Sequence, residues 1–237
     1  GYAYESIKYG LQDFMIAGGA EELSVSEAVM FDVLYATSVN NQNPKQTPAP
    51  FDKNRDGLVI GEGAATLILE DLETAQSRGA KIYAELLGYG ANSDGEHLTA
   101  PAVSGMKKVM ELALEDANLP AEAIGYLNAH GTATEVGDIA ETAATNMVFG
   151  DRIPISSLKG HFGHTMGACG ALETWMTLQM ARENWFAPTL NLHEVDSRCA
   201  KLDYLQDEGR QLEVEYVMCN NFAFGGVNTS LIFKKWN

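Results

Sequence analysis

Two stretches of this 237-residue chain repeat the same order of strand, polar loop and helix. In the first, a strand predicted at 124–128 is followed by Ala-His-Gly-Thr and by helical spacing over 136–148; the second runs from Ile153 through Lys159 to a helix starting near Gly167. Repeated strand–helix units form a sheet covered by helices, and the ends of its strands are where ligands bind. The sequence therefore predicts an α/β fold with its functional residues at these strand ends.

The rest of the chain supports the same class. Apolar spacing predicts helices at 3–10, 27–36, 75–79 and 104–118, and strands at 13–17, 64–70 and 82–90, the first of these strands being short and buried. A closing strand, turn and strand are predicted over 216–235, with Gly225-Gly226 as the turn. The segment 39–57 is rich in Asn, Pro and Asp, which is typical of a surface loop.

Composition excludes several classes of protein. The formal net charge of -16 argues against nucleic-acid binding, which depends on neutralising phosphates with Lys and Arg. No apolar stretch approaches the ~20 residues of a membrane-spanning helix, so no membrane association is expected. Three cysteines without metal or disulfide spacing (Cys169, Cys199 and Cys219) are expected to be buried, and they favour a reducing, cytoplasmic location.

Three segments combine a polar reactive residue with glycines: NAHGTATEVGD at 128–138, SSLKGHFGHTMGACGALE at 156–173 and CNNFAFGGVN at 219–228. A single histidine in such a turn is more often structural than catalytic, and nothing assigns His161 a partner. Lys159 and His164, however, come from one loop just before a helix N-terminus, a place that favours developing negative charge. A nearby lysine also disfavours protonation of an imidazole, which predicts a neutral histidine able to donate from one nitrogen.

Together with YGLQDFMIAGGAEE and the long segment from PFDKNRDG to GYGANSD, these segments resemble the elongating β-ketoacyl-acyl-carrier-protein synthases of the thiolase superfamily. Thiolases and initiating synthases would not show HGT followed by KxxxxH. The resemblance implies a layered αβαβα fold, with residues 1–78 as the end of the N-terminal half and residues 79–237 as the C-terminal half. It also implies an acyltransferase that joins an acyl thioester to malonyl-acyl-carrier protein by decarboxylative Claisen condensation in fatty acid biosynthesis.

The resemblance assigns roles residue by residue. His130 and His164 correspond to the pair that donates hydrogen bonds to the thioester carbonyl of the malonyl unit, which stabilises the enolate formed when carbon dioxide leaves. Lys159 corresponds to the lysine that orients this pair, with Glu141 expected as its partner.

Further positions match the family's substrate-binding residues. Thr132 and Thr134 correspond to threonines that contact the phosphopantetheine arm of the carrier protein. Phe224, with Phe222 beside it, resembles the aromatic gate between the acyl pocket and the malonyl site. No cofactor is required, although some members hold a structural sodium or potassium ion at positions that match Asn128, Glu173 and Asn220.

The nucleophilic cysteine of the family does not lie within this sequence. Gly1 corresponds to a point inside the helix that carries this cysteine, so we expect the nucleophile about two helical turns upstream and expect the chain alone to be inactive. Acyl carrier protein is the implied partner, with Lys53 and Arg55 as candidate contacts or, alternatively, as ordinary solvated loop residues. The full-length protein is expected to be a homodimer.

Other functions stay open. A polyketide or aryl-polyene ketosynthase would use the same residues on a different chain. A chain-length factor, the non-catalytic partner of a ketosynthase, would carry Gln or another inert residue at the nucleophile position.

Overall fold

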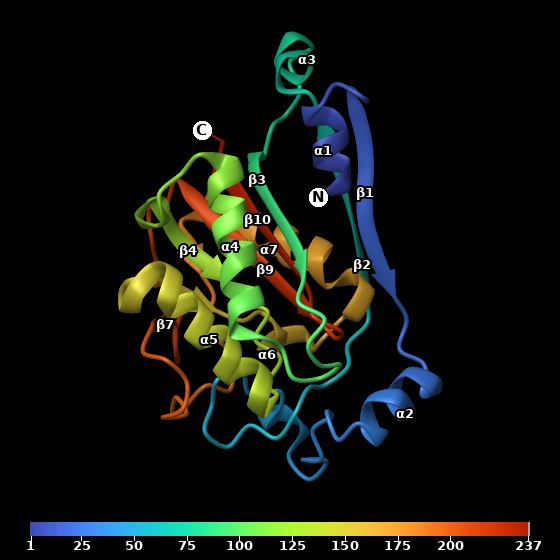
Figure 1. The fold of residues 1–237 in the computed structure, drawn as a ribbon, viewed down its shortest axis with the longest axis vertical. Coiled ribbons are helices and arrows are strands. Elements are labelled where there is room, and N and C mark those ends of the chain that lie inside the picture. The colour runs from blue at the N-terminus through green and yellow to red at the C-terminus, as the bar shows by residue number, and fades with distance from the viewer. Residues whose placement is uncertain (237) are drawn as a thin grey trace.

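The computed structural model describes residues 1–236 and contains a six-stranded mixed sheet and a separate two-stranded antiparallel sheet (Figure 1). The large sheet has the strand order β3-β10-β9-β4-β5-β7. Its strands are β3 (Ala84–Ser93), β10 (Val227–Lys235), β9 (Tyr216–Ala223), β4 (Ile124–Asn128), β5 (Pro154–Ser156) and β7 (Asp203–Tyr204). Because β4 is parallel to both β9 and β5, their carboxyl ends meet at one edge of the sheet.

Helices cover both faces of this sheet. On one face lie α4 (Val103–Ala117) and α5 (Glu135–Phe149), which follow β3 and β4 in the sequence (Figure 1). On the other face lies α7 (Cys169–Glu183), between the large sheet and the two-stranded sheet. The buried residues form two hydrophobic clusters, one that includes residues of α4 and α5 and one that includes residues of α7. The predicted α/β class is confirmed, and helices and sheets alternate in layers.

The two-stranded sheet consists of β1 (Phe14–Glu21) paired antiparallel with β2 (Gly63–Glu70), and α1 (Tyr2–Lys8) packs beside it (Figure 1). Side chains on its inner face pack toward α1 and α7, but Ile16 and Ile68 on the outer face are each 65% exposed among the described residues. The strand predicted at 13–17 is longer than expected, since β1 runs from Phe14 to Glu21. The prediction that it is buried is wrong, because nothing within residues 1–236 covers its outer face.

Sequence periodicity located most of the other elements to within a few residues. The predicted helix at 27–36 is α2 (Val25–Val33), the helix near 75–79 is α3 (Leu72–Ser77), and the stop at Asn118 is a left-handed C-cap. Elements of two to four residues have too few positions to show a period, and the sequence did not predict them. They are α6 (Lys159–Phe162), β6 (Trp185–Phe186), β7, β8 (Arg210–Gln211) and four short 3-10 turns.

No helix among residues 1–236 is both long enough and apolar enough to cross a membrane.

Candidate active site

The ends of β4 and β5 bring the predicted catalytic residues together. Asn128 and Ser156, the last residues of these strands, pair with each other, and His130 and Lys159 follow them in the chain. The Lys159 Nζ atom lies 3.2 Å from His130 Nδ1. The rings of His130 and His164 have centroids 5.0 Å apart and are almost perpendicular, at 85°. Two imidazoles and one ammonium group thus occupy a single buried cluster.

Glu173 on α7 is the partner of Lys159, with Nζ 2.5 Å from Oε1 and both side chains only 1% exposed. Burial lowers the pKa of Lys159, but Glu173, together with smaller contributions from Cys169 and Glu141, outweighs this effect, and the net pKa is raised. Burial also raises the pKa of Glu173, while the ammonium opposes that shift; we assign the pair as ionised because of the short contact. Glu141, expected as the partner of Lys159, does not make this direct contact, but its charge also raises the pKa of Lys159.

Glu141, on α5, instead holds the backbone of the histidine loop. Its two carboxylate oxygens accept hydrogen bonds from the backbone N–H groups of His130, at 2.8 Å, and Gly131, at 2.7 Å. Burial raises the pKa of Glu141 to about 7, and these two donors oppose the shift. Glu141 therefore fixes where the His130 ring can lie.

Asp138, one helical turn before Glu141, supports the same loop and was not predicted from the sequence. Its carboxylate accepts from the backbone N–H groups of Ala133, at 3.1 Å, and Phe51, at 2.7 Å. Burial raises its pKa to about 6. The sequence contained a signal for this arrangement: Asp138 and Glu141 are three positions apart on one helix face, and that helix follows the turn at Gly131.

Gly131 is required at its position. Its φ is +35°, and a Cβ atom there would lie 2.6 Å from Ser157 Cβ. The Ser157 hydroxyl donates to the Gly131 carbonyl at 2.7 Å, so the two loops that carry the histidines are in direct contact.

His164 is held by neutral groups. Its backbone N–H donates to the carbonyl of Val59 at 2.7 Å, and its own carbonyl accepts from Gly61 N–H at 2.9 Å. Its ring Nδ1 accepts from the backbone N–H of Met166 at 3.1 Å. Because a backbone N–H can only donate, this Nδ1 carries no proton, and the ring proton of the neutral imidazole lies on Nε2.

The same tautomer follows for His130 from a different donor. The protonated Lys159 can only donate, so His130 Nδ1 is the acceptor and Nε2 carries the proton. Burial, followed by the charge of Lys159, lowers the pKa of both histidines well below the usual value. Both rings are therefore neutral N–H donors at neutral pH. His161, by contrast, lies at the surface, with Nε2 2.8 Å from the carbonyl oxygen of Pro188.

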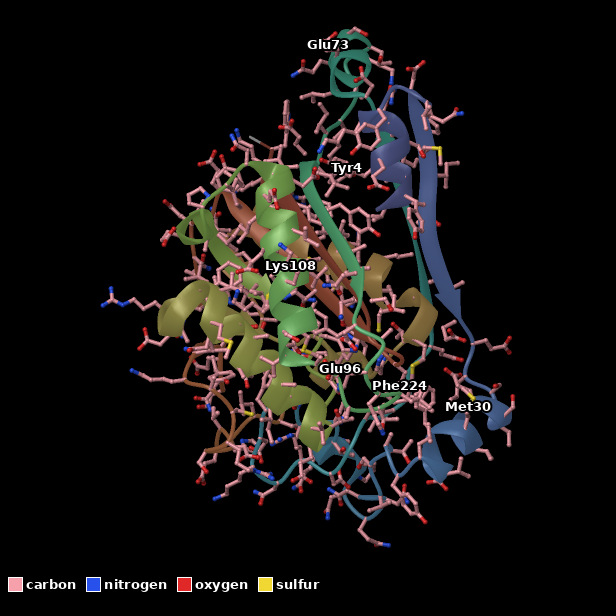
Figure 2. The ribbon with its side chains drawn as sticks, in the orientation of Figure 1. Tyr4, Met30, Glu73, Glu96, Lys108 and Phe224 are labelled. Carbon is pink, nitrogen blue, oxygen red and sulfur yellow. The ribbon has the colours of Figure 1, made fainter. Side chains whose placement is uncertain are left out.

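The other predicted substrate-binding residues divide into two groups. Thr132 and Thr134 are partly exposed, and their hydroxyls lie 2.8 Å apart in the loop after His130. Phe222 is buried and meets the His130 ring edge-on, with centroids 6.2 Å apart. Phe224 lies beyond the end of β9 and contacts Phe31 of α2, the helix that also carries the labelled Met30 (Figure 2). The two phenylalanines therefore face different surroundings.

Of the three predicted cation ligands, Glu173 is the partner of Lys159, and Asn128 and Asn220 lie on the neighbouring strands β4 and β9. Asn128 pairs with the residue before Asn220 on the neighbouring strand β9, and its amide helps to lower the pKa of Glu173. Within residues 1–236, however, neither polar atom of the buried Asn128 amide makes a well-formed hydrogen bond, and neither does Asn220 Nδ2. No group of three His, Cys, Asp or Glu side chains in the same part of the chain is arranged to hold a metal ion.

The two basic residues considered for carrier-protein contact differ in accessibility. The Lys53 side chain is 46% exposed and forms a surface ion pair with Glu194. The Arg55 side chain is only 1% exposed and bonds the carboxylates of Asp196, at 2.7 Å, and Asp138, at 3.4 Å. The proposal of Arg55 as a docking residue is therefore wrong, because its charge is satisfied inside the protein.

Comparison with known proteins gives consistent matches along the chain. A family model described as "Beta-ketoacyl synthase, N-terminal domain" matches residues 1–75, and one described as "Beta-ketoacyl synthase, C-terminal domain" matches residues 83–193. The 3-oxoacyl-[acyl-carrier-protein] synthase 1 of Haemophilus influenzae is 44% identical over 239 residues, which are 100% of this chain and 58% of that relative. The chain thus spans a little over half the length of this relative.

Solved structures agree with these matches. A β-ketoacyl synthase from Burkholderia phymatum STM815 is 61% identical, with a TM-score of 0.99 over 100% of this chain and 58% of that one. A ketosynthase in complex with a type II polyketide-synthase acyl carrier protein is 34% identical, with a TM-score of 0.94 over 100% of this chain and 60% of that one. The thiolase-like layered fold predicted from the sequence is confirmed by these matches.

Proposed function

Because this chain belongs to the β-ketoacyl synthase family, we propose that the full-length protein joins an acyl thioester to malonyl-acyl-carrier protein by decarboxylative Claisen condensation, as in fatty acid biosynthesis. The observation that carries this proposal is the cluster of two neutral imidazoles around one buried ammonium, formed by His130, His164 and Lys159. N–H donors fixed in a dry site are suited to a carbonyl oxygen that becomes negative during reaction.

In the proposed reaction, the malonyl thioester oxygen accepts hydrogen bonds from Nε2–H of His130 and of His164. As the C–C bond to the carboxylate breaks, its electron pair forms the enolate, carbon dioxide leaves, and the two donors stabilise the negative oxygen. The enolate carbon then attacks an acyl thioester on a cysteine upstream of Gly1, and the cysteine thiolate leaves. Burial and, after it, the charge of Lys159 keep both rings neutral, and Lys159 donates to Nδ1 of His130.

The proposed substrate is delivered on the phosphopantetheine arm of an acyl carrier protein, and Thr132 and Thr134 would contact this arm. Within the fold, residues 1–78 would end the N-terminal half and residues 79–237 would form the C-terminal half. Residues before Gly1 would cover the outer face of the two-stranded β1–β2 sheet. The whole protein would be a homodimer. Three free, buried cysteines are consistent with a cytoplasmic location.

The residues that correspond to the family's cation ligands fit a sodium or potassium ion. Within residues 1–236 the side-chain oxygen of Asn128 is buried without a hydrogen-bond partner, and amide and carboxylate oxygens suit such hard cations. Asn128, Asn220 and Glu173 would hold the ion, which would supply positive charge beside the carboxylate of Glu173.

Decarboxylation of malonyl-acyl-carrier protein by the full-length protein tests the proposal without requiring the acyl substrate. We expect His164→Ala to lower the decarboxylation rate by at least about 100-fold, the usual size of a lost oxyanion donor. His193→Ala, a change at an exposed histidine, is the matched control and should leave the rate unchanged. Equal rates in wild type and His164→Ala, or no decarboxylation by wild type, would contradict the proposal.

A polyketide ketosynthase is the second candidate, supported by the 34% identity to a ketosynthase bound to a type II polyketide carrier protein. Mass spectrometry of products formed from malonyl-acyl-carrier protein alone separates the two. A fatty acid synthase of this class gives one condensation for each round of reduction, whereas a polyketide synthase elongates repeatedly without reduction.

A further inference from the structure

We propose that Cys169 is a positioning residue for His164: its thiol donates a hydrogen bond to ring Nδ1 and holds the neutral ring in the orientation that presents Nε2–H. This inference rests on the proposed function only in so far as it names the reaction that His164 serves. The sequence provided no reason to connect Cys169 with the chemistry, and the expected role for this cysteine was burial alone.

The contact is specific. Cys169 is the first residue of α7, and its Sγ lies 3.2 Å from His164 Nδ1. The backbone N–H of Met166 points to the same nitrogen from 3.1 Å. Because that backbone group can only donate, Nδ1 is unprotonated, and the sulfur can form a hydrogen bond to it only by donating its own proton.

A second hydrogen bond directs the thiol proton. The Thr165 hydroxyl donates to Cys169 Sγ at 3.4 Å, so the sulfur accepts the hydrogen bond from Thr165. The S–H bond is then free to point toward His164. Thr165, Cys169 and His164 form a relay in which each group donates to the next, and such chains strengthen their members by mutual polarisation.

The thiol form is favoured in this position. A helix N-terminus and a nearby ammonium would both favour a thiolate, as in reactive cysteines. Here burial is the larger influence and raises the pKa of Cys169, while Lys159 opposes it and the buried Glu173 supports it. A protonated thiol is the form that can donate.

The expected consequence is chemical as well as geometric. Hydrogen bonds donated to Nδ1 draw electron density from the ring and make Nε2–H a better donor to the enolate oxygen. The thiol adds a donor to the one that the backbone N–H of Met166 already supplies. The other two cysteines, Cys199 and Cys219, make no hydrogen bond to either catalytic ring among the described residues.

The test uses three variants of the full-length protein: Cys169→Ala removes the donor, Cys169→Ser keeps a donor of similar size, and Cys199→Ala is a matched control at another buried cysteine. Magic-angle-spinning spectra of protein with 15N-labelled histidine report Nδ1 directly, and the His164 signal is assigned by its loss in His164→Ala. Decarboxylation rates are measured on the same samples.

We expect Cys169→Ala to move the His164 Nδ1 signal toward that of a free, unbonded ring nitrogen, whereas Cys199→Ala does not. The decarboxylation kcat should fall by about threefold in Cys169→Ala, as suits loss of one weak donor, and recover in Cys169→Ser. An unchanged Nδ1 signal in Cys169→Ala overturns the proposal. If the wild type fails to decarboxylate while the signal still moves, the positioning role stands and the proposed function fails.

Discussion

The two loops that carry the histidines reach the same chemical state by different means. The first loop, residues 129–134, is fixed by buried carboxylates: Glu141 binds its backbone, and the Lys159–Glu173 pair supplies the donor to its ring. The second loop, residues 157–166, is fixed at His164 by backbone groups from the neighbouring segment 59–61 and by Met166 N–H. Each imidazole is neutral with its proton on Nε2.

This difference shows which parts of the site depend on charge. Buried ion pairs and buried carboxylates are costly to leave unpartnered, so single substitutions around the first loop should have large effects. Backbone hydrogen bonds survive side-chain substitution, so substitutions beside His164 should be better tolerated than substitutions of Lys159, Glu173 or Glu141. Substitutions in the full-length protein test this contrast.

The largest effect is expected from Lys159→Met. The change leaves Glu173 buried without its cation and removes the donor to His130, so stability should fall by about 3–5 kcal/mol in chemical denaturation, and decarboxylation should be lost. Lys159→Met combined with Glu173→Gln removes both charges. This double variant should recover most of the stability but not the activity, and a failure to recover would mean that packing, not charge, explains the loss.

Glu141→Ala should come next. Two buried backbone N–H groups, those of His130 and Gly131, lose their acceptor, which should cost about 2–4 kcal/mol of unfolding free energy. Glu135→Ala, in the first turn of the same helix, changes a side chain that is 65% exposed and should cost less than about 1 kcal/mol. Equal losses in the two variants would contradict the role assigned to Glu141.

The pH dependence of stability should include a contribution from the same carboxyl, beside that of Asp138, whose pKa is raised to about 6. The pKa of Glu141 is about 7 in the folded protein against an ordinary value of 4.5, so between these values the folded state binds more protons than the unfolded state. Stability from this group is therefore full below pH 4.5 and is lost as pH rises through 7. Glu141→Gln, which cannot titrate, should flatten the stability profile in this range, and a profile parallel to that of wild type would refute the shift.

The smallest effect is expected in the pH–rate profile. An imidazole of ordinary pKa, near 6.5, would be half protonated at pH 6.5 and would halve the decarboxylation rate. Because both histidines have pKa values well below this, kcat should stay nearly constant from pH 7.5 to 6.5. Glu141, with a pKa of about 7, also titrates in this interval. A halving of kcat that persists in Glu141→Gln would show that at least one ring is more easily protonated than the structure indicates.

The sequence predicted the fold well where the signal was local. Alternating strand and helix patterns located β4, α4 and α5, because each has enough residues to show its period. The segments HGT and KGHFGH identified the three residues that meet in the site. The burial of β1 was mispredicted because a strand with two apolar faces reads the same whether or not another element covers it.

By itself, then, the sequence determined the α/β class, the order of the elements and the identity of the histidines and the lysine, since all of these depend on residues close together in the chain. Only the tertiary structure decided which carboxylate faces Lys159. Glu141 and Glu173 lie on different helices, and the family resemblance implied Glu141 beside the lysine and Glu173 at a cation site. Packing of α7 against the sheet brought Glu173 to the ammonium and set the Cys169 thiol against His164, while α5 placed Glu141 on the backbone of the first loop. These contacts depend on how separate elements pack, and no local pattern records that.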